Sequence, residues 1–404
     1  MLRRQEIITV TKEKMKILQI IPGSGGSFYC GNCLRDSKYV TALRNQGHEV
    51  VKIPMYLPLF SDEHDLSGIP VFYGAVSIYL KQLYPIFRKA PSWFDKLLNS
   101  KPVLKLAAGL AGSTRAKGLE EMTISMLLGE DGQQREELDR MVDWISENYK
   151  PDIIHISNAL LLGLAHQLKL KINVPLICSL QDEDTWVDVM KPSIRDKIWQ
   201  LMESKAEFVD AFIAVSDHYK IVMGKNMNIP DHKMNKVHLG VDPDDYSYVS
   251  PAEKKLSVGF ISRMCFDNGL DILIDAFIEL RGRKEFRDLN LVITGGSTGD
   301  DADYIKDIKK KLKKHNLKEA VDFHHDFEGI GRHEFFGKVS VVSVPVRNGE
   351  AFGIYLLESM ASGVPVVQPS LGAFPEIIKG SGGGLLYTPN TSQTLANCLF
   401  GLRP

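Results

Sequence analysis

The sequence predicts an α/β protein that contains two doubly wound domains, and three observations support this fold class. The chain has 404 residues, which is too many for one ordinary hydrophobic core and suits two domains. Short continuous apolar runs alternate with helical patterns, as in parallel sheets that helices cover on both faces. The strand-turn-helix pattern also begins twice, at Ile17 and again at Val258.

The first domain is predicted to begin with a buried strand, a Gly-rich turn and a helix. The strand is expected at 17–21 and the helix at 34–46, and Gly47 ends that helix before a second strand at 49–53. Their separation by helical segments favours parallel pairing of the strands. Further short apolar strands are expected at 153–156, 175–180 and 211–215.

The second domain repeats this pattern after a polar passage. Residues 242–255 are rich in Asp, Pro, Ser and Tyr without an apolar period, and we interpret them as a linker. We therefore predict a Rossmann-like N-terminal domain at 15–245 and a Rossmann-like C-terminal domain at 246–404. Two such domains form a cleft at the carboxyl ends of their sheets, where ligands bind. The strands of the second sheet are expected at 257–261, 291–294, 339–344 and 364–367.

Composition excludes several classes of protein. The net charge of -1 argues against a dedicated nucleic-acid binder, which is usually basic. No apolar run approaches the ~20 residues that span a bilayer, and residues 1–14 lack the apolar centre of a signal peptide. Met15 directly precedes the first strand and is an alternative start of the chain. Five Cys do not form a disulfide framework, so we expect a reducing cytoplasmic location.

The most informative segment is 344–367, which places a strand, a Gly turn, a helix and another strand in succession. Glu350 is expected at the helix start and Glu358 eight residues later, which corresponds to a rise of ~12 Å. One carboxylate would then meet a sugar and the other a ribose, with a diphosphate at the helix N-terminus between them. Gly353 would let the backbone approach closely. Two Glu at this spacing alone more often mark a helix start and a solvated face.

The surrounding residues favour the binding interpretation. The runs Glu-Ala-Phe-Gly from Glu350 and Glu-Ser-Met-Ala-Ser-Gly-Val-Pro-Val-Val from Glu358 resemble the Glu-x7-Glu motif of retaining GT-B glycosyltransferases of family four. This resemblance implies that Glu350 contacts the donor sugar and Glu358 the ribose, with Phe352 in the same donor site. It also implies a GT-B fold, retention of configuration, and no cofactor or metal.

The resemblance extends over about 15–389. Residues 259–263 and 269–271 resemble the opening of the family's C-terminal domain, in which Arg263 would neutralise the donor diphosphate. Gly295 belongs to a Gly-rich turn after the next strand, and 371–376 resemble the loop that approaches the diphosphate. The family pattern usually continues into a helix that crosses back to the first domain, and such a helix is not apparent before Pro404.

The Gly-rich turn after the first strand is a second candidate for phosphate contact. Gly25 and Gly26 lie in this turn, where backbone N–H groups can face an anion, although turns need glycine in any case. Cys30 and Cys33 follow as a Cys-x-x-Cys pair, which suits structural or acceptor-pocket cysteines, a redox pair or half a zinc site. No second Cys pair accompanies them, which disfavours zinc.

Two positions depart from the family pattern within the predicted site. The family usually carries a Lys where this chain has Asn268, so one cation beside the diphosphate is lost, and Arg347 or a helix N-terminus is a candidate to compensate for it. The family often carries a His near the donor sugar where this chain has Gln181, followed by Asp182. His155 on another strand end is an alternative polar contact, although a His in an apolar strand is more often structural.

A basic segment distinguishes the first domain. Residues 79–118 contain eight Lys and Arg against Asp95, interleaved with aromatic and Leu side chains. A solvated helical face explains this pattern, and contact with an anionic membrane surface is the sharper alternative. Some family members use this region to reach lipid-linked acceptors, so we keep peripheral contact with the inner membrane surface as a hypothesis.

We therefore predict a glycosyltransferase that moves a sugar from a nucleotide diphosphate donor to a carbohydrate or lipid-linked acceptor. One alternative is another enzyme of the same fold, such as a sugar-nucleotide epimerase or a phosphorylase. An epimerase needs titratable acid and base groups in the cleft, which Gln181 does not supply. The other alternative is a sugar-nucleotide or glycan-binding protein without catalysis, which Asn268 and Gln181 favour.

Overall fold

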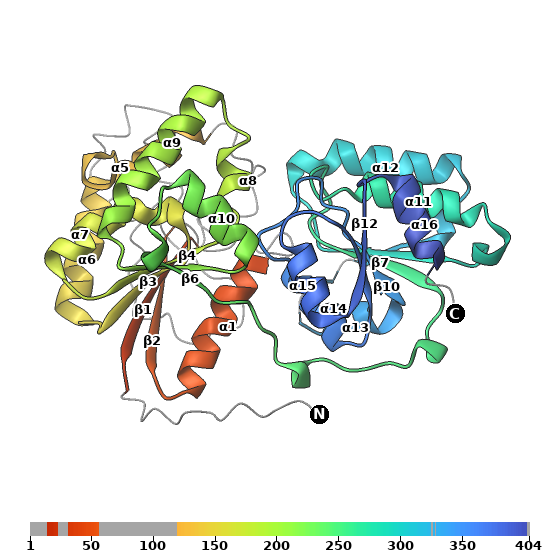
Figure 1. The fold of residues 1–404 in the computed structure, drawn as a ribbon, viewed down its shortest axis with the longest axis horizontal. Helices are drawn as coiled ribbons and strands as arrows, with labels where there is room; N and C mark the ends of the chain where they lie inside the picture. The colour runs from red at the N-terminus through yellow and green to blue at the C-terminus, as the bar shows by residue number, and fades with distance from the viewer. Residues whose placement is uncertain (1–13, 23–30, 56–118, 325, 328, 402–404) are drawn as a thin grey trace, which may run out of the picture.

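The computed structural model describes residues 14–22, 31–55, 119–324, 326–327 and 329–401. Figure 1 shows two lobes, each built around one sheet with helices on both of its faces. The chain passes between the lobes through an extended segment that leaves strand β6 and includes the short turns Pro243–Asp245 and Pro251–Glu253. This arrangement confirms the α/β fold class with two domains, while the boundary at 245/246 stays a prediction.

The first sheet is parallel throughout and has the order β2-β1-β3-β4-β5-β6. Its register pairs Ile17 with Val50 and with Ile153, so the three strands present their side chains in common rows. The strands are β1 (Lys16–Ile21), β2 (Glu49–Pro54), β3 (Ile153–Ile156), β4 (Leu176–Leu180), β5 (Ala211–Ala214) and β6 (Met234–Lys236). The described helices of this domain are α1 (Gly31–Asn45), α5 (Glu120–Leu128), α6 (Arg135–Asn148), α7 (Ala165–Lys171), α8 (Glu183–Val187), α9 (Pro192–Lys205) and α10 (Asp217–Asn226).

The second sheet is also parallel and has the order β12-β11-β10-β7-β8-β9. Its strands are β7 (Ser257–Ile261), β8 (Asn290–Thr294), β9 (Val321–Phe323), β10 (Val341–Val342), β11 (Val366–Pro369) and β12 (Gly384–Tyr387). Its described helices are α11 (Leu270–Arg281), α12 (Ala302–Lys314), α13 (Gly329–Lys338), α14 (Ile354–Ala361), α15 (Phe374–Ser381) and α16 (Ser392–Gly401). Helix α16 packs on α11 and on strands β11 and β12 of the same domain.

The strands form where the sequence is continuously apolar because both faces of each sheet are covered. All five residues of β7 are buried, as are four of the five residues of β8. Strand β10 is shorter than the predicted 339–344, because only Val341 and Val342 pair in the ladder while the residues after them are buried without strand pairing. No helix in the described ranges is long and apolar enough to cross a membrane.

Candidate functional site

The loop between β10 and α14 carries the first Glu of the motif. Glu350 lies four residues before α14 begins at Ile354, so it belongs to the loop rather than to the helix start. The expected helical rise of ~12 Å between Glu350 and Glu358 is therefore wrong, because only the second half of this segment is helical. Gly353 has φ +86°, and a Cβ there would lie 3.0 Å from Glu350 Oε2. Glycine thus permits both the turn and the position of the carboxyl group.

A cavity of about 120 Å³ lies between the two domains at the carboxyl ends of their sheets. Gln181 follows β4 directly and Ser262 follows β7 directly, so both sheets contribute to it. The first turn of α1 meets the start of α14, since a Cβ on Gly31 would lie 3.2 Å from Ile354 Cγ2. The lining residues are Gly31, Asn32, Arg35, Gln181, Asp182, Val215, Leu239, Ser262, Glu350, Ala351, Phe352, Gly353, Ile354 and Tyr355.

Asp182 connects the two walls of this cavity. Its Oδ2 accepts a hydrogen bond from Asn32 Nδ2 at 3.1 Å, and its Oδ1 accepts one from Ala351 N at 3.2 Å. Ser216 Oγ donates to the carbonyl oxygen of Ala351 at 2.7 Å. The Ala351 residue beside Glu350 is therefore held by two side chains of the N-terminal domain. The backbone of Asp182 is left-handed, with φ 56°.

A buried carboxyl group behind this turn fixes its conformation. Glu183 is fully buried and accepts hydrogen bonds from Ala159 N at 2.8 Å, Gln181 N at 2.7 Å and the Tyr219 hydroxyl at 2.7 Å. Burial raises the pKa of Glu183 to about 7, although the hydrogen bonds oppose this shift. Sequence analysis did not identify Glu183, and its position inside an acidic run directly after a buried strand is the signal that was available.

The carboxyl group of Glu350 has an unusual protonation state. Burial, and next the negative charge of Asp182, raise its pKa to about 8. This shift favours the protonated form, which can donate a hydrogen bond as well as accept one. Such a group in a cleft is typical of functional sites, although structural clusters shift pKa values too.

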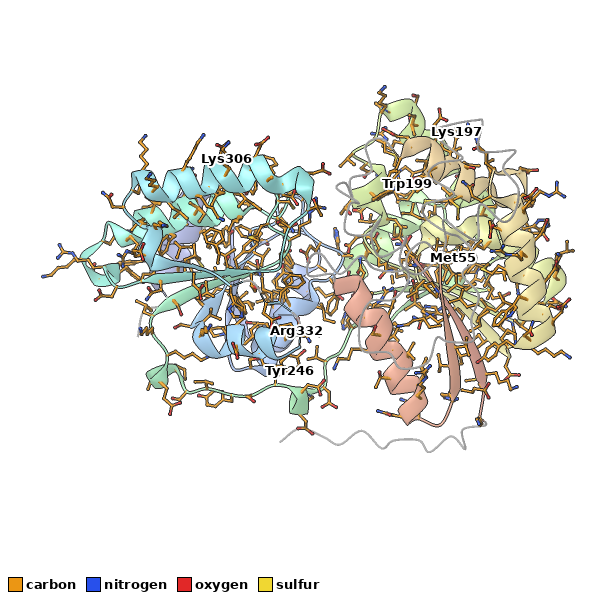
Figure 2. The ribbon with its side chains drawn as sticks, turned by 180° about the vertical axis from the view of Figure 1, so that it is seen from behind. Met55, Lys197, Trp199, Tyr246, Lys306 and Arg332 are labelled. Carbon is orange, nitrogen blue, oxygen red and sulfur yellow. The ribbon has the colours of Figure 1, made fainter. Side chains whose placement is uncertain are left out.

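The second Glu of the motif lies apart from the cavity. Glu358 is fully buried in α14 and does not line the cavity. Its Oε1 accepts a hydrogen bond from the Tyr246 hydroxyl at 2.8 Å and lies 3.0 Å from Arg332 Nε. Figure 2 labels Tyr246 and Arg332, which lie near one another below the second sheet. The linker segment and α13 thus meet at this carboxylate.

The cations expected beside the diphosphate have protein partners. Arg263 donates from Nε to Asp301 at 2.8 Å and from Nη2 to Thr298 Oγ1 at 2.7 Å. Asn268 donates to Ser262 Oγ at 2.8 Å and to the Arg263 carbonyl oxygen at 3.0 Å. Asn268 therefore supports the turn after β7, and neither residue lines the cavity.

Arg347 is also engaged elsewhere in the C-terminal domain. Its guanidinium donates to both carboxylate oxygens of Asp271, at 3.1 and 2.6 Å, and lies 3.6 Å from the ring centre of Phe266. Burial alone would raise the pKa of Asp271, but the hydrogen bond from Arg347 helps to lower it below its ordinary value. The suggestion that Arg347 replaces the missing Lys is thus not supported by its contacts.

The other predicted residues divide between the cavity and the fold. Phe352 and Gly353 line the cavity with Gln181 and Asp182. Gly295 has φ +116° and packs against the Ser262 backbone, so it shapes the turns after β7 and β8.

His155 and several other predictions fall outside the cavity. His155 lies in the sheet and bonds Ser179 Oγ at 2.8 Å, and burial followed by the Arg35 charge lowers its pKa to about 3. The Gly25, Gly26 and Cys30 predictions and the 79–118 segment lie outside the described residues, as does the side chain of Cys33. In the described part of the chain, no group of three His, Cys, Asp or Glu side chains suits a metal ion.

A second carboxylate crosses the domain boundary at Glu376. It accepts hydrogen bonds from Asp217 N at 2.8 Å at the start of α10, and its other oxygen contacts His238 Nε2 at 2.6 Å and Lys236 Nζ at 3.3 Å. Although burial opposes it, these contacts lower the pKa of Glu376. The residue was expected in a loop near the diphosphate, and the structure uses it to hold the domains together.

Comparison with known proteins assigns both halves of the chain to related families. The model of Glycosyl transferases group 1 matches residues 255–402, and the model of Glycosyltransferase Family 4 matches residues 128–245. An uncharacterised glycosyltransferase of Methanocaldococcus jannaschii is 29% identical over 46% of this chain and 48% of that protein. The chain aligns with between about a third and a half of the length of such curated relatives.

Solved structures show the same fold. Sucrose-phosphate synthase from Thermosynechococcus elongatus matches with a TM-score of 0.69 and 16% identity, over 96% of this chain and 90% of that one. The Anabaena protein HepE in complex with UDP-glucose matches with a TM-score of 0.63 and 18% identity, over 96% of this chain and 89% of that one. The fold is therefore GT-B, and the chain belongs to the group 1 glycosyltransferases of family four.

Proposed function

We propose that this chain transfers a sugar from a nucleoside diphosphate donor to an acceptor, with the reaction in the cavity between the domains. The observation that supports this most is that the start of α14, the carboxyl group of Glu350 and the Asp182 carboxylate line one cavity. A helix N-terminus favours phosphate, and carboxyl groups suit sugar hydroxyls. The family membership supports this activity, and HepE, which has the same fold, binds UDP-glucose.

In this proposal the donor lies across the start of α14. Its diphosphate accepts hydrogen bonds from the free N–H groups of that helix, and its sugar contacts Glu350. The ribose lies toward Glu358, which is buried outside the cavity, so binding would have to open a path to its carboxylate and replace the contacts of Tyr246 and Arg332 with ribose hydroxyls. The raised pKa of Glu350 favours its protonated form, which can donate to one sugar oxygen while it accepts from another hydroxyl.

We further propose that transfer retains the configuration of the sugar and needs no metal, as the family resemblance implies. The acceptor hydroxyl then attacks on the face from which the phosphate leaves, and the leaving phosphate takes the proton. No separate catalytic base is required in this scheme, and His155, whose pKa is lowered to about 3, would be a weak base. Carbohydrate and lipid-linked acceptors both fit this scheme. Membrane contact through 79–118 and a cytoplasmic location stay predictions.

A binding protein without catalysis is the second candidate. The observation that favours it is the engagement of Arg263 by Asp301 and of Arg347 by Asp271, with neutral Asn268 beside them. Fewer cations at the diphosphate would stabilise the leaving group less. Such a protein would bind nucleotide sugars and release no nucleoside diphosphate.

The test is a screen of nucleotide sugars for binding and for release of nucleoside diphosphate, with UDP-glucose as the first probe. We expect release by the wild-type protein and at least tenfold weaker nucleotide binding by Glu358→Gln, since ribose hydroxyls lose a charged acceptor. Glu334→Gln, exposed on α13, is the matched control. Binding without release would select the second candidate, and no binding of any nucleotide would refute both.

A further inference from the structure

Arg35 is a buried cation with one unused donor group. It lies on α1, is 2% exposed and lines the cavity. Its Nη2 donates to Asp36 Oδ1 and to the Ser157 carbonyl oxygen, both at 2.9 Å, while its Nε donates to Asp36 at 3.2 Å. Its Nη1 is buried and has no hydrogen-bond partner among the residues that the structure describes. Buried donors are seldom left unpaired, so this atom points to a ligand that supplies an acceptor.

Gln181 lines the same cavity and carries a buried acceptor atom. The residue is 4% exposed, and its Oε1 is buried with no donor in the described part of the chain. The residue is held in place by its backbone, since Gln181 N donates to Glu183 and its carbonyl oxygen accepts from Asn158 Nδ2 at 3.3 Å. The cavity therefore contains a fixed cationic donor that lacks an acceptor and a fixed acceptor that lacks a donor.

The positive charge of Arg35 acts beyond its ion pair. Burial raises the pKa of Asp36, while Arg35 and Lys52 oppose this shift. The Arg35 charge also contributes, after burial, to the low pKa of His155. An anion in the cavity would therefore meet an attractive field on the N-terminal wall.

We propose that Arg35 and Gln181 form a subsite for a phosphate oxyanion that carries a neighbouring hydroxyl group. The oxyanion accepts from Arg35 Nη1, and the hydroxyl donates to Gln181 Oε1. Phosphate fits because the start of α14, which favours phosphate, opens into the same cavity. This inference rests on the proposed function and adds a recognition element on the N-terminal wall.

Two substrates supply this chemistry. In the donor, the diphosphate would reach Arg35 and a sugar hydroxyl would reach Gln181. In a phosphorylated acceptor, both groups would come from the molecule that receives the sugar. The plain alternative is water, since the cavity has room for it and water can satisfy both groups.

The test is calorimetric titration of UDP, GDP, ADP and glucose 6-phosphate into wild-type protein and two Arg35 variants. Arg35→Lys keeps the ion pair with Asp36 but lacks the third nitrogen, so it should fold and still bind more weakly. Arg35→Gln removes the charge as well, and thermal unfolding checks its fold. Arg44→Gln changes the same charge on the exposed side of α1 and is the matched control.

We expect about tenfold to a hundredfold weaker binding of the phosphate-bearing ligand by both Arg35 variants, and no change with Arg44→Gln. If the Arg35 variants lose affinity only for nucleotides, the phosphate belongs to the donor. If they lose affinity only for glucose 6-phosphate, the phosphate belongs to an acceptor. Wild-type affinity of Arg35→Lys for every ligand that the wild type binds would overturn the subsite and leave the proposed function intact. If the wild type binds no nucleotide, the proposed function fails, and the subsite survives only through Arg35-dependent binding of glucose 6-phosphate.

Discussion

The two walls of the cavity are built in different ways. The C-terminal wall is one continuous segment in which Gly353 turns the chain, Glu350 faces the cavity and α14 presents its N-terminus. The N-terminal wall gathers single side chains from α1, from the turn after β4 and from the start of α10. A local sequence pattern therefore describes the first wall, whereas only the tertiary fold brings the second wall together.

The walls also differ in how they are stabilised. The C-terminal loop depends on backbone conformations that suit glycine. The N-terminal turn depends on the buried carboxyl group of Glu183, which accepts two backbone hydrogen bonds and one from Tyr219. We therefore expect pH to change stability through Glu183 on the N-terminal wall and, at higher pH, through Glu350 on the C-terminal wall, where it also changes the charge in the cavity.

The largest expected effect concerns Glu183 and the pH dependence of stability. Its folded pKa of about 7 lies above its ordinary value, so folding favours the protonated form. Its contribution is full below the ordinary pKa and is lost as pH rises through about 7, at a cost of about 3 kcal/mol. Denaturant unfolding between pH 5 and 9 measures this loss.

Glu183→Gln should flatten this pH dependence around pH 7. Glu350 has a raised pKa of about 8, so its contribution to the free energy of unfolding is also lost as pH rises, but at higher pH. Glu350→Gln should therefore remove a separate part of the dependence of stability on pH. If Glu183→Gln follows the wild-type profile at every pH, the buried carboxyl group does not govern the N-terminal wall.

The next effect concerns Asp182, which joins the walls. We expect Asp182→Asn to reduce donor cleavage about tenfold to a hundredfold, because the amide cannot accept from both Asn32 and Ala351. Loss of the Asp182 charge should also lower the pKa of Glu350, so activity should decline at lower pH than in the wild type. Rates of nucleoside diphosphate release across pH measure both effects, with exposed Asp196→Asn as the control. An unshifted pH profile would contradict the coupling.

The smallest effect concerns Glu376, which connects the domains away from the cavity. Glu376→Gln weakens its contacts with His238 and Lys236, and partly exposed pairs of this kind are worth less than about 1 kcal/mol. We expect Glu376→Gln to raise the KM for the donor by up to about fivefold. This difference from the wild type should shrink with added salt, because salt screens the contacts that the wild type makes. A hundredfold loss of turnover would instead place Glu376 in the reaction itself.

The sequence predicted the fold class and the C-terminal wall because both depend on local patterns. Buried strands appear as apolar runs, and the segment around Glu350 is continuous in the chain. Partners of Arg263 and Arg347 could not be predicted, since Asp301 and Asp271 approach them only through the fold. The role of Arg35 was missed because one Arg in a helix gives no sign of burial.

Calorimetry can separate the roles that we propose for the two carboxyl groups, with Glu350 at the sugar and Glu358 at the ribose. Affinities of UDP and UDP-glucose are measured for wild-type protein, Glu350→Gln and Glu358→Gln. We expect Glu350→Gln to bind UDP as the wild type does while it loses the additional affinity that the sugar provides, and Glu358→Gln to bind both ligands more weakly. Equal loss of UDP and UDP-glucose binding in Glu350→Gln would contradict this division between the two carboxyl groups.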